Sequence, residues 1–165
     1  MTNHYRPPKT LRRFMRSNAF VRAVVGPVGS GKSSACVVEI LRRSREQTPG
    51  ADGVRRTRWA IIRNTYPELR DTTRKTFEQW IPATFGEWRE REFTFAMRFA
   101  LDDGTRVESE VLFRALDRPD DVKKLLSLEL TGAYINEARA VPQHIFDVLQ
   151  TRVGRYPSKL QGGPS

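Results

Sequence analysis

Eight residues near the amino end of the chain read Gly26-Pro27-Val28-Gly29-Ser30-Gly31-Lys32-Ser33. They fit the pattern G-x-x-x-x-G-K-[ST] of a phosphate-binding loop without a mismatch. In such a loop, glycines let the backbone wrap a phosphate. The helix that follows points its first amides and the positive end of its dipole at the anion. This stretch therefore predicts a nucleotide-binding P-loop.

The residues on either side fit a P-loop as well. Residues 20–25 read as a short apolar strand, and residues 33–45 read as a helix. We expect Lys32 to reach the β- and γ-phosphates of a nucleotide and Ser33 to place its hydroxyl on Mg²⁺. Backbone groups of the eight loop residues and of Ser34 complete the expected nucleotide cradle.

Length and composition favour a single domain that binds no structural metal. The chain has 165 residues, and we expect one domain over residues 1–165. No apolar run is long enough to cross a membrane, so no membrane partner is expected. A lone cysteine, Cys36, reads as a buried thiol, and the two histidines, His4 and His144, offer no metal-ligand cluster.

Positive charge is concentrated in the first third of the chain. Residues 1–58 hold 13 Lys or Arg and 3 Asp or Glu, which accounts for the whole net charge of +10. A polyanionic partner, above all nucleic acid, explains such a basic end, and so does a solvated basic tail. Charge alone leaves both interpretations open.

The rest of the chain alternates between strand and helix signals. Residues 11–18 predict a short basic helix, residues 58–63 a buried parallel strand, and residues 71–82 a helix capped by Asp71. Residues 92–100 and 107–114 form a predicted antiparallel hairpin around Asp102-Asp103-Gly104, either at the edge of the main sheet or as an inserted ribbon. Further on, residues 119–126 and 142–149 predict helices, with a strand over residues 128–137 between them.

A second acidic site follows the last predicted strand. P-loop ATPases carry a buried strand that ends in a carboxylate near the magnesium ion, and hydrolytic motors add a glutamate that polarises water. Here Asn136 stands where an aspartate is expected, and Glu137 follows it. We therefore expect Ser33, Asn136 and Glu137 to form the metal site, with Glu137 as the catalytic base. A simple strand followed by a helix-capping acid is the alternative.

Arginines are candidates for stabilising charge in the transition state. Arg139, Arg152 and Arg155 lie near or after Glu137 in the sequence, and each is a candidate to act from a neighbouring subunit. Arg63, at the end of a predicted parallel strand, is a candidate for sensing the nucleotide.

Five segments occur in an order that resembles one family. They are Phe14-Met15-Arg16-Ser17, the P-loop, Arg63-Asn64-Thr65-Tyr66-Pro67-Glu68-Leu69, residues 128–138 and Arg152-Val153-Gly154-Arg155-Tyr156-Pro157-Ser158. Together they resemble the ATPase domain of the tailed-phage large terminase subunit, the motor that packs DNA into proheads. The P-loop is generic, whereas the segments that begin at Arg63 and Arg152 are more specific.

The resemblance implies an α/β fold of the ASCE (RecA-like) P-loop type, with a mainly parallel central sheet, flanking helices and an antiparallel hairpin. It implies that Lys32 and Ser33 bind Mg²⁺ and ATP, that Glu137 is catalytic and that Phe14 lies near the adenine. It further implies double-stranded DNA, a portal protein and a small terminase subunit as partners, a homo-oligomeric ring, and a place in the cytoplasm of the bacterial host.

Within this frame the chain divides into a basic segment (residues 1–18), a P-loop core (residues 19–155) and a terminal loop (residues 156–165). The loop is expected to mark a truncation before the coupling motif and the RNase H-like nuclease domain of the family, so no nuclease activity is expected. Two other functions stay open: a P-loop kinase for a small molecule, and a nucleotide-binding module with little activity of its own.

Overall fold

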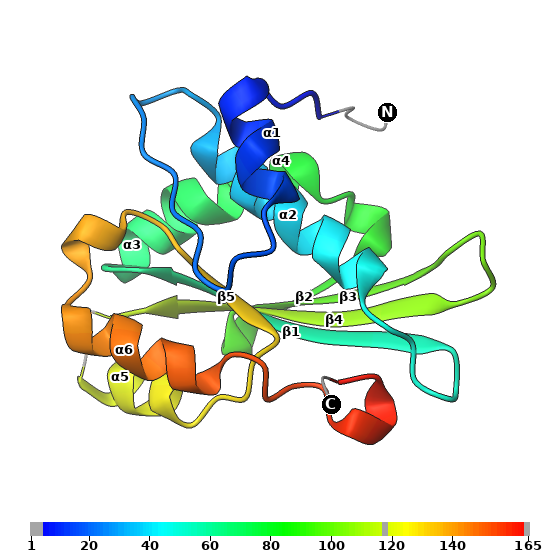
Figure 1. Ribbon diagram of the computed structural model, residues 1–165. Coiled ribbons are helices and arrows are strands. Elements are labelled where there is room, and N and C mark those ends of the chain that lie inside the picture. The colour runs from blue at the N-terminus through cyan, green and yellow to red at the C-terminus, as the bar shows by residue number, and fades with distance from the viewer. Residues whose placement is uncertain (1–4, 117–118, 164–165) are drawn as a thin grey trace.

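A five-stranded sheet with helices on both faces makes up the structure, a computed structural model that describes residues 5–116 and 119–163. Helices α1 (Lys9–Arg16), α2 (Lys32–Glu46) and α4 (Lys75–Trp80) lie over one face of the sheet, and α5 (Pro119–Leu126) and α6 (Gln143–Arg152) cover the other (Figure 1). The chain therefore forms a three-layer α/β sandwich, as expected from its alternating strand and helix signals.

The sheet is mixed rather than mainly parallel. Its strands are β1 (Val54–Arg63), β2 (Gly86–Arg89), β3 (Thr94–Ala100), β4 (Arg106–Ala115) and β5 (Gly132–Ile135), in the order β2-β3-β4-β1-β5. Strand β1 pairs in parallel with β4 and β5, whereas β3 pairs antiparallel with β2 and β4. The predicted hairpin is thus part of the main sheet, extended at its edge by β2, which the sequence did not predict.

Strand β1 supplies both hydrophobic cores because successive side chains of a strand point to opposite faces. On one face Ile61 packs with Val37 and Ile40 of α2 and with an aromatic group around Phe77. On the other face Ala60 and Ile62 pack with residues of α5 and α6. The buried run over the second half of β1 agrees with the predicted central parallel position.

Aromatic rings fill the core beneath α4. Phe77 makes edge-to-face contacts with Trp88, Phe95 and Phe113, at centroid distances of 6.0, 5.2 and 5.3 Å. These rings come from β2, β3 and β4, so one helix residue joins three strands. Edge-to-face aromatic pairs add to the stabilisation from buried area.

One predicted strand is wrong. Residues 20–25 form no strand and pair with no strand of the described sheet, and Phe20 and Val25 are 65% and 93% exposed. The guanidinium of Arg22 instead donates to the backbone oxygens of Phe14 and Ser17. These bonds hold the segment close to the end of α1.

The helix that precedes β2 begins earlier than predicted. It runs from α3 (Tyr66–Glu68) through a π-helical turn (Leu69–Arg74) into α4, so Asp71 lies inside it and pairs with Arg70 rather than capping it. Short 3₁₀ turns span Ala83–Phe85, Glu90–Glu92, Ala138–Ala140 and Lys159–Gln161. The other predicted helices and strands are confirmed within a few residues, except that residues 1–4 and 164–165 of the predicted terminal segments lie outside the described part.

Among the described residues, no helix combines the length and apolar character that crossing a bilayer requires.

Candidate functional site

The P-loop has the backbone that its glycines allow. Gly29 and Gly31 adopt φ values of 76° and 78°, a left-handed conformation that favours glycine. The Lys32 ammonium donates to the backbone oxygens of Gly26 and Pro27, at 2.8 and 2.6 Å, and to the Ser30 hydroxyl at 3.2 Å. The lysine therefore folds back over its own loop.

The start of α2 is suited to an anion. Its first backbone bond runs from the Ala35 amide to the Gly31 oxygen at 2.9 Å, so the amides of Lys32, Ser33 and Ser34 precede the helical ladder. No side chain caps this end, where Gly31 is the capping residue. Free amides and the helix dipole favour a bound phosphate at this position.

Strand β5 ends against this helix start. The side chain of Tyr134, in β5, packs against the core that includes Val37 and Ile40 of α2 and lies near that of Ser33. Burial, together with the nearby Cys36, raises the pKa of Tyr134 well above its ordinary value. Asn136 and Glu137 come directly after β5, so the predicted second acidic site lies near the P-loop. Tyr134 was not predicted from the sequence, because Ser33 lies about a hundred residues away from it.

Glu137 is held in place by a residue of the neighbouring strand. The Arg63 guanidinium, at the end of β1, lies 3.2 Å from the Glu137 carboxylate. Arg63 is only 9% exposed, whereas the Glu137 side chain is 49% exposed. Glu137 also adopts a left-handed backbone with φ of 56°, a strained conformation for a residue other than glycine that is often found at functional sites.

The π-helical turn Leu69–Arg74 supplies two further hydroxyls. Thr72 Oγ1 accepts a 3.0 Å hydrogen bond from Arg63, and Thr73 Oγ1 accepts one of 3.2 Å from the Asn136 amide. Asn136 thus contacts Thr73, while Ser33 lies near Tyr134. Sequence reasoning did not identify either threonine. A π turn often marks a functional position, but it could not be predicted from residue pattern alone.

Helix α1 lies beside the P-loop. A Cβ atom added to Gly31 would lie 3.6 Å from the Leu11 side chain, so the apolar side of α1 adjoins the loop. Phe14, expected near the adenine, is half-buried on this helix and lies under the Arg22 guanidinium at 5.1 Å. Its place near a nucleotide base stays a prediction.

An ion-pair cluster joins this region to α2. The carboxylate of Glu39, which is 5% exposed, lies 2.7 Å from Arg22, 2.7 Å from Arg42 and 2.9 Å from Arg43. Burial acts to raise the pKa of Glu39, but the three arginine hydrogen bonds outweigh it and hold the pKa below its ordinary value. We call these four residues the Glu39 cluster. The Arg42 guanidinium also donates to the Met15 oxygen of α1.

No contact in the described part of the chain brings the other candidate arginines, Arg139, Arg152 and Arg155, to Glu137. Arg139 is exposed in the turn after β5. The Arg152 oxygen accepts from the Leu130 amide, and the amide of Arg155 donates to the Leu130 oxygen, so both residues lie at the amino end of β5. At about 3.3 Å per residue, this end is about 20 Å from Glu137. Action from a neighbouring subunit stays a prediction for all three.

The donor set suits a magnesium ion bound together with phosphate better than a resident metal. No group of three or more His, Cys, Asp or Glu side chains able to hold a metal occurs in the described ranges. Magnesium typically takes few protein ligands and shares phosphate oxygens. The hydroxyl of Ser33, the amide oxygen of Asn136 and the carboxylate of Glu137 fit this chemistry. Cys36 is buried, as predicted, and burial raises its pKa to about 12.

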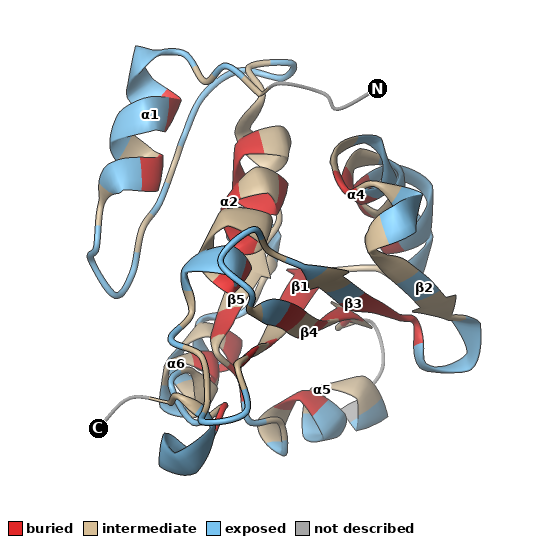
Figure 2. Ribbon diagram, turned by 90° about the vertical axis from the view of Figure 1, so that its right-hand side faces the viewer, coloured by how far each residue is buried: buried red, intermediate tan, exposed pale blue. Residues whose placement is uncertain are grey.

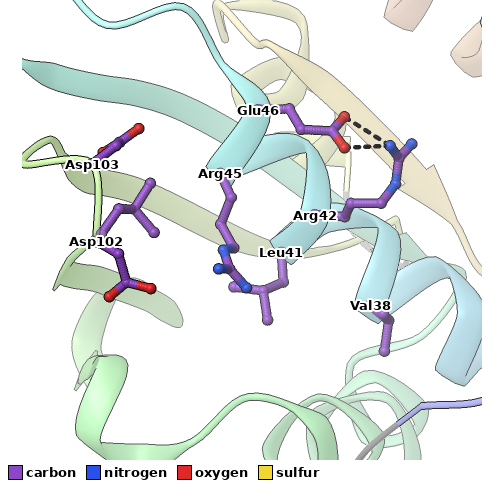
Figure 3. Close-up of a pocket in the computed structure, with 8 residues that line it drawn as sticks. Val38, Leu41, Arg42, Arg45, Glu46, Asp102 and Asp103 are labelled. Atoms are coloured by element: carbon purple, nitrogen blue, oxygen red, sulfur yellow. Dashed lines mark hydrogen bonds and ion pairs between the residues drawn. The ribbon is translucent and has the colours of Figure 1, made fainter.

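A separate cavity of about 570 Å³ lies between the second half of α2 and the β3–β4 turn. Figure 3 shows Arg45 between Leu41 and Asp102 there, with Arg42 paired to Glu46. None of its lining residues belongs to the P-loop or follows β5. The cavity is therefore distinct from the candidate site, whose chemistry lies at the start of α2.

Comparison with known proteins gives a likeness in structure alone. No protein-family model matches the chain, and no curated protein matches it. Its structure is similar to that of the large terminase from a thermophilic bacteriophage. One crystal form superimposes with a TM-score of 0.62 at 10% identity, covering 77% of this chain and 29% of that chain.

A second structure of that terminase, in complex with ADP, gives a TM-score of 0.59 at 10% identity over 77% of this chain and 29% of that chain. A third structure gives a TM-score of 0.61 at 10% identity, covering 88% of this chain and 34% of that chain. The chain thus spans about a third of the length of the proteins it matches. At this identity the likeness concerns the fold alone, and what it shows is that the chain has a large-terminase-like fold.

Proposed function

We propose that this chain is the ATP-binding and hydrolysing motor domain of a viral DNA-packaging terminase large subunit, with an ASCE (RecA-like) P-loop fold. The observation that carries the proposal is the position of Tyr134 in β5, which packs against the core that includes Val37 and Ile40 of α2 and lies near Ser33 and Glu137. This position supports a single site that combines Lys32, at the start of α2, with Glu137, after β5. Similarity to a terminase in complex with ADP supports a nucleotide as the ligand.

Each residue at the start of α2 has a distinct role in this proposal. Lys32 exchanges its contacts with the loop oxygens for the β- and γ-phosphates of ATP, and the amides around Ser33 hold the same phosphates. Ser33, Asn136 and Glu137 would hold Mg²⁺, which neutralises phosphate charge when bound. Asparagine brings no charge, so we expect weaker metal binding than an aspartate would give.

Glu137 acts as the base in the proposed reaction. It accepts a proton from the water that attacks the γ-phosphate, and the bond to the β-phosphate breaks to leave ADP and inorganic phosphate. Arg63 is a positioning residue, because its ion pair with Glu137 fixes where the carboxylate lies. Thr72 holds Arg63 in turn.

The work of the proposed motor is to move double-stranded DNA into a prohead in the cytoplasm of the bacterial host. A homo-oligomeric ring, a portal protein and a small terminase subunit complete the proposed assembly. In such a ring Arg139, Arg152 or Arg155 of one subunit supplies positive charge to the ATP of the next.

A nucleotide-binding module with little turnover alone is the second candidate. Two observations favour it: the Lys32 ammonium is occupied by three oxygens of its own loop, and an amide replaces the expected carboxylate at Asn136. Hydrolysis that rises with protein concentration supports an assembled motor. Nucleotide binding without hydrolysis at any concentration supports the module.

Two substitutions test the proposed motor. Lys32→Ala is expected to lower ATP hydrolysis about 100-fold or more, because it removes the positive charge that stabilises the transferred phosphate. Glu137→Gln keeps the shape of the side chain and is expected to lower turnover by a similar factor while nucleotide still binds. Both are measured by phosphate release and by fluorescent-nucleotide titration. Hydrolysis unchanged in Lys32→Ala contradicts the proposal, and a phosphorylated acceptor in place of free phosphate indicates a kinase.

A further inference from the structure

Helix α1 presents four cations on one side. Lys9, Arg12, Arg13 and Arg16 follow the spacing i, i+3, i+4, i+7, which places side chains on one side of a helix. All four are exposed, and Figure 2 shows the exposed side of α1 facing away from α2. Leu11 and Met15 lie on the opposite side and are buried. We call the four cations the α1 basic face.

No carboxylate in the described part of the chain is paired with this face. The first acidic residue of the chain is Glu39, and it is enclosed by the arginines of its own cluster. Within residues 5–116 and 119–163, none of the four cations is paired with an Asp or Glu. By contrast, the half-buried Arg74 pairs with both Glu78 and Glu90. The α1 basic face is therefore available to an external anion.

The helix is also fixed in position. Arg42 donates to the Met15 oxygen at 2.9 Å, and Arg22 donates to the Phe14 oxygen at 3.2 Å. Both arginines are themselves held by Glu39. Because α1 is anchored before any partner arrives, binding does not have to order a free tail, which lowers its entropic cost.

We propose that the α1 basic face binds the phosphate backbone of duplex DNA. From Lys9 to Arg16 the helix rises about 10 Å, and duplex DNA carries one negative charge per about 1.7 Å of its axis, so several phosphates lie within reach. A lipid surface fits less well, because Leu11 and Met15 are already buried and cannot enter a bilayer. The assignment rests on the proposed function and adds a DNA-contacting surface to it.

The test compares two variants of the full chain. The first replaces the α1 basic face by Lys9→Gln, Arg12→Gln, Arg13→Gln and Arg16→Gln. The matched control removes four exposed cations from other elements by Lys75→Gln, Arg91→Gln, Arg98→Gln and Lys159→Gln. A labelled DNA duplex of mixed sequence, without nucleotide, is titrated between about 50 and 200 mM salt. Circular dichroism melts check that both variants fold.

The α1 variant is expected to bind at least about tenfold more weakly than the wild type at about 100 mM salt. Its plot of log affinity against log salt is expected to be less steep by about 3 to 4, since each phosphate contact contributes about 0.9. The control is expected to change both quantities much less. Equal losses in the two variants, or no loss in the α1 variant, overturn the proposal. An α1 variant that keeps its affinity for DNA but loses its affinity for poly-glutamate also overturns the proposal, because that result indicates an acidic protein partner.

Failure of this proposal is distinguishable from failure of the proposed motor. Lys32→Ala removes hydrolysis if the motor proposal holds, whatever the α1 basic face does. If the α1 variant loses DNA affinity while the wild type hydrolyses no ATP, the DNA surface stands and the motor proposal fails. If hydrolysis depends on Lys32 but DNA affinity is independent of the α1 basic face, only the DNA surface is overturned.

Discussion

The central sheet and residues 17–31, which include the P-loop up to Gly31, are held by different forces. The sheet is joined by backbone ladders and by two hydrophobic cores. Residues 17–31 join no strand in the described part and expose Phe20, Val25 and Val28. Ion pairs and side-chain bonds of the Glu39 cluster hold them instead. The comparison indicates that the buried cores lie in and around the sheet, whereas the proposed phosphate-binding loop lies in a segment that exposes its large apolar side chains.

The largest expected effect comes from a substitution in the hydrophobic core that packs on the sheet. Phe77→Ala removes a fully buried ring that contacts Trp88, Phe95 and Phe113, and is expected to cost about 3–5 kcal/mol of unfolding free energy. Phe20→Ala removes a ring that is 65% exposed and is expected to change the unfolding free energy by less than about 0.5 kcal/mol. Urea unfolding of both variants measures the difference. Similar losses would mean that residues 17–31 are packed in solution.

A smaller effect is expected from the tether of the P-loop region. Glu39→Gln removes the charge that three arginines share and is expected to cost about 1–3 kcal/mol, less than for a fully buried pair because the arginines are partly exposed. Glu46→Gln, at a side chain that is 51% exposed, is the matched control, with an expected cost below about 0.5 kcal/mol. Equal costs in urea unfolding would show that the Glu39 cluster adds nothing to stability.

The same carboxylate predicts a pH dependence. Arginine hydrogen bonds hold the pKa of folded Glu39 below its ordinary value of 4.5. Its contribution to stability is therefore fully present above about pH 4.5 and is lost as the pH falls through the lower, folded pKa. We expect the gap in unfolding free energy between wild type and Glu39→Gln to shrink on acidification. A gap that is constant from about pH 7 to about pH 3 would contradict this.

The smallest expected effect concerns a site residue that belongs to the sheet. Arg63→Gln removes the ion pair with Glu137 and is expected to lower kcat by about tenfold or less, because Glu137 keeps its chemistry but loses its orientation. Nucleotide affinity is expected to change little. A large loss of affinity with unchanged kcat would indicate instead that Arg63 contacts the nucleotide, which is the role predicted from its position at the end of a parallel strand.

Local patterns predicted much of the fold. Helix α2, strand β1, the β3–β4 hairpin and helix α5 each have a clear periodicity or turn signal. Strand β2 was missed because it is only four residues long. Its glycine, Gly86, lies so close to β3 that a Cβ atom would collide with the Ala96 oxygen, which explains why a strand residue there lacks a side chain.

Non-local contacts account for the errors. Residues 20–25 have the apolar pattern of a strand, but pairing depends on distant partners, and the bonds of Arg22 keep the segment beside α1. Sequence motifs predict candidate site residues where the motif is local, as at Lys32 and Glu137, and their roles stay predictions. Tyr134, Thr72 and Thr73 were missed because each acts through a residue distant in the sequence or through a π turn.

The contacts of Lys32 within its own loop define the nucleotide-free state against which nucleotide affinity is measured. An ammonium that donates to Gly26, Pro27 and Ser30 is already solvated by protein, so an incoming phosphate exchanges one set of partners for another. The measured dissociation constant therefore reports a difference between two bound forms of the same lysine. A substitution at Ser30 that weakens the free form would tighten nucleotide binding without adding any contact to the nucleotide.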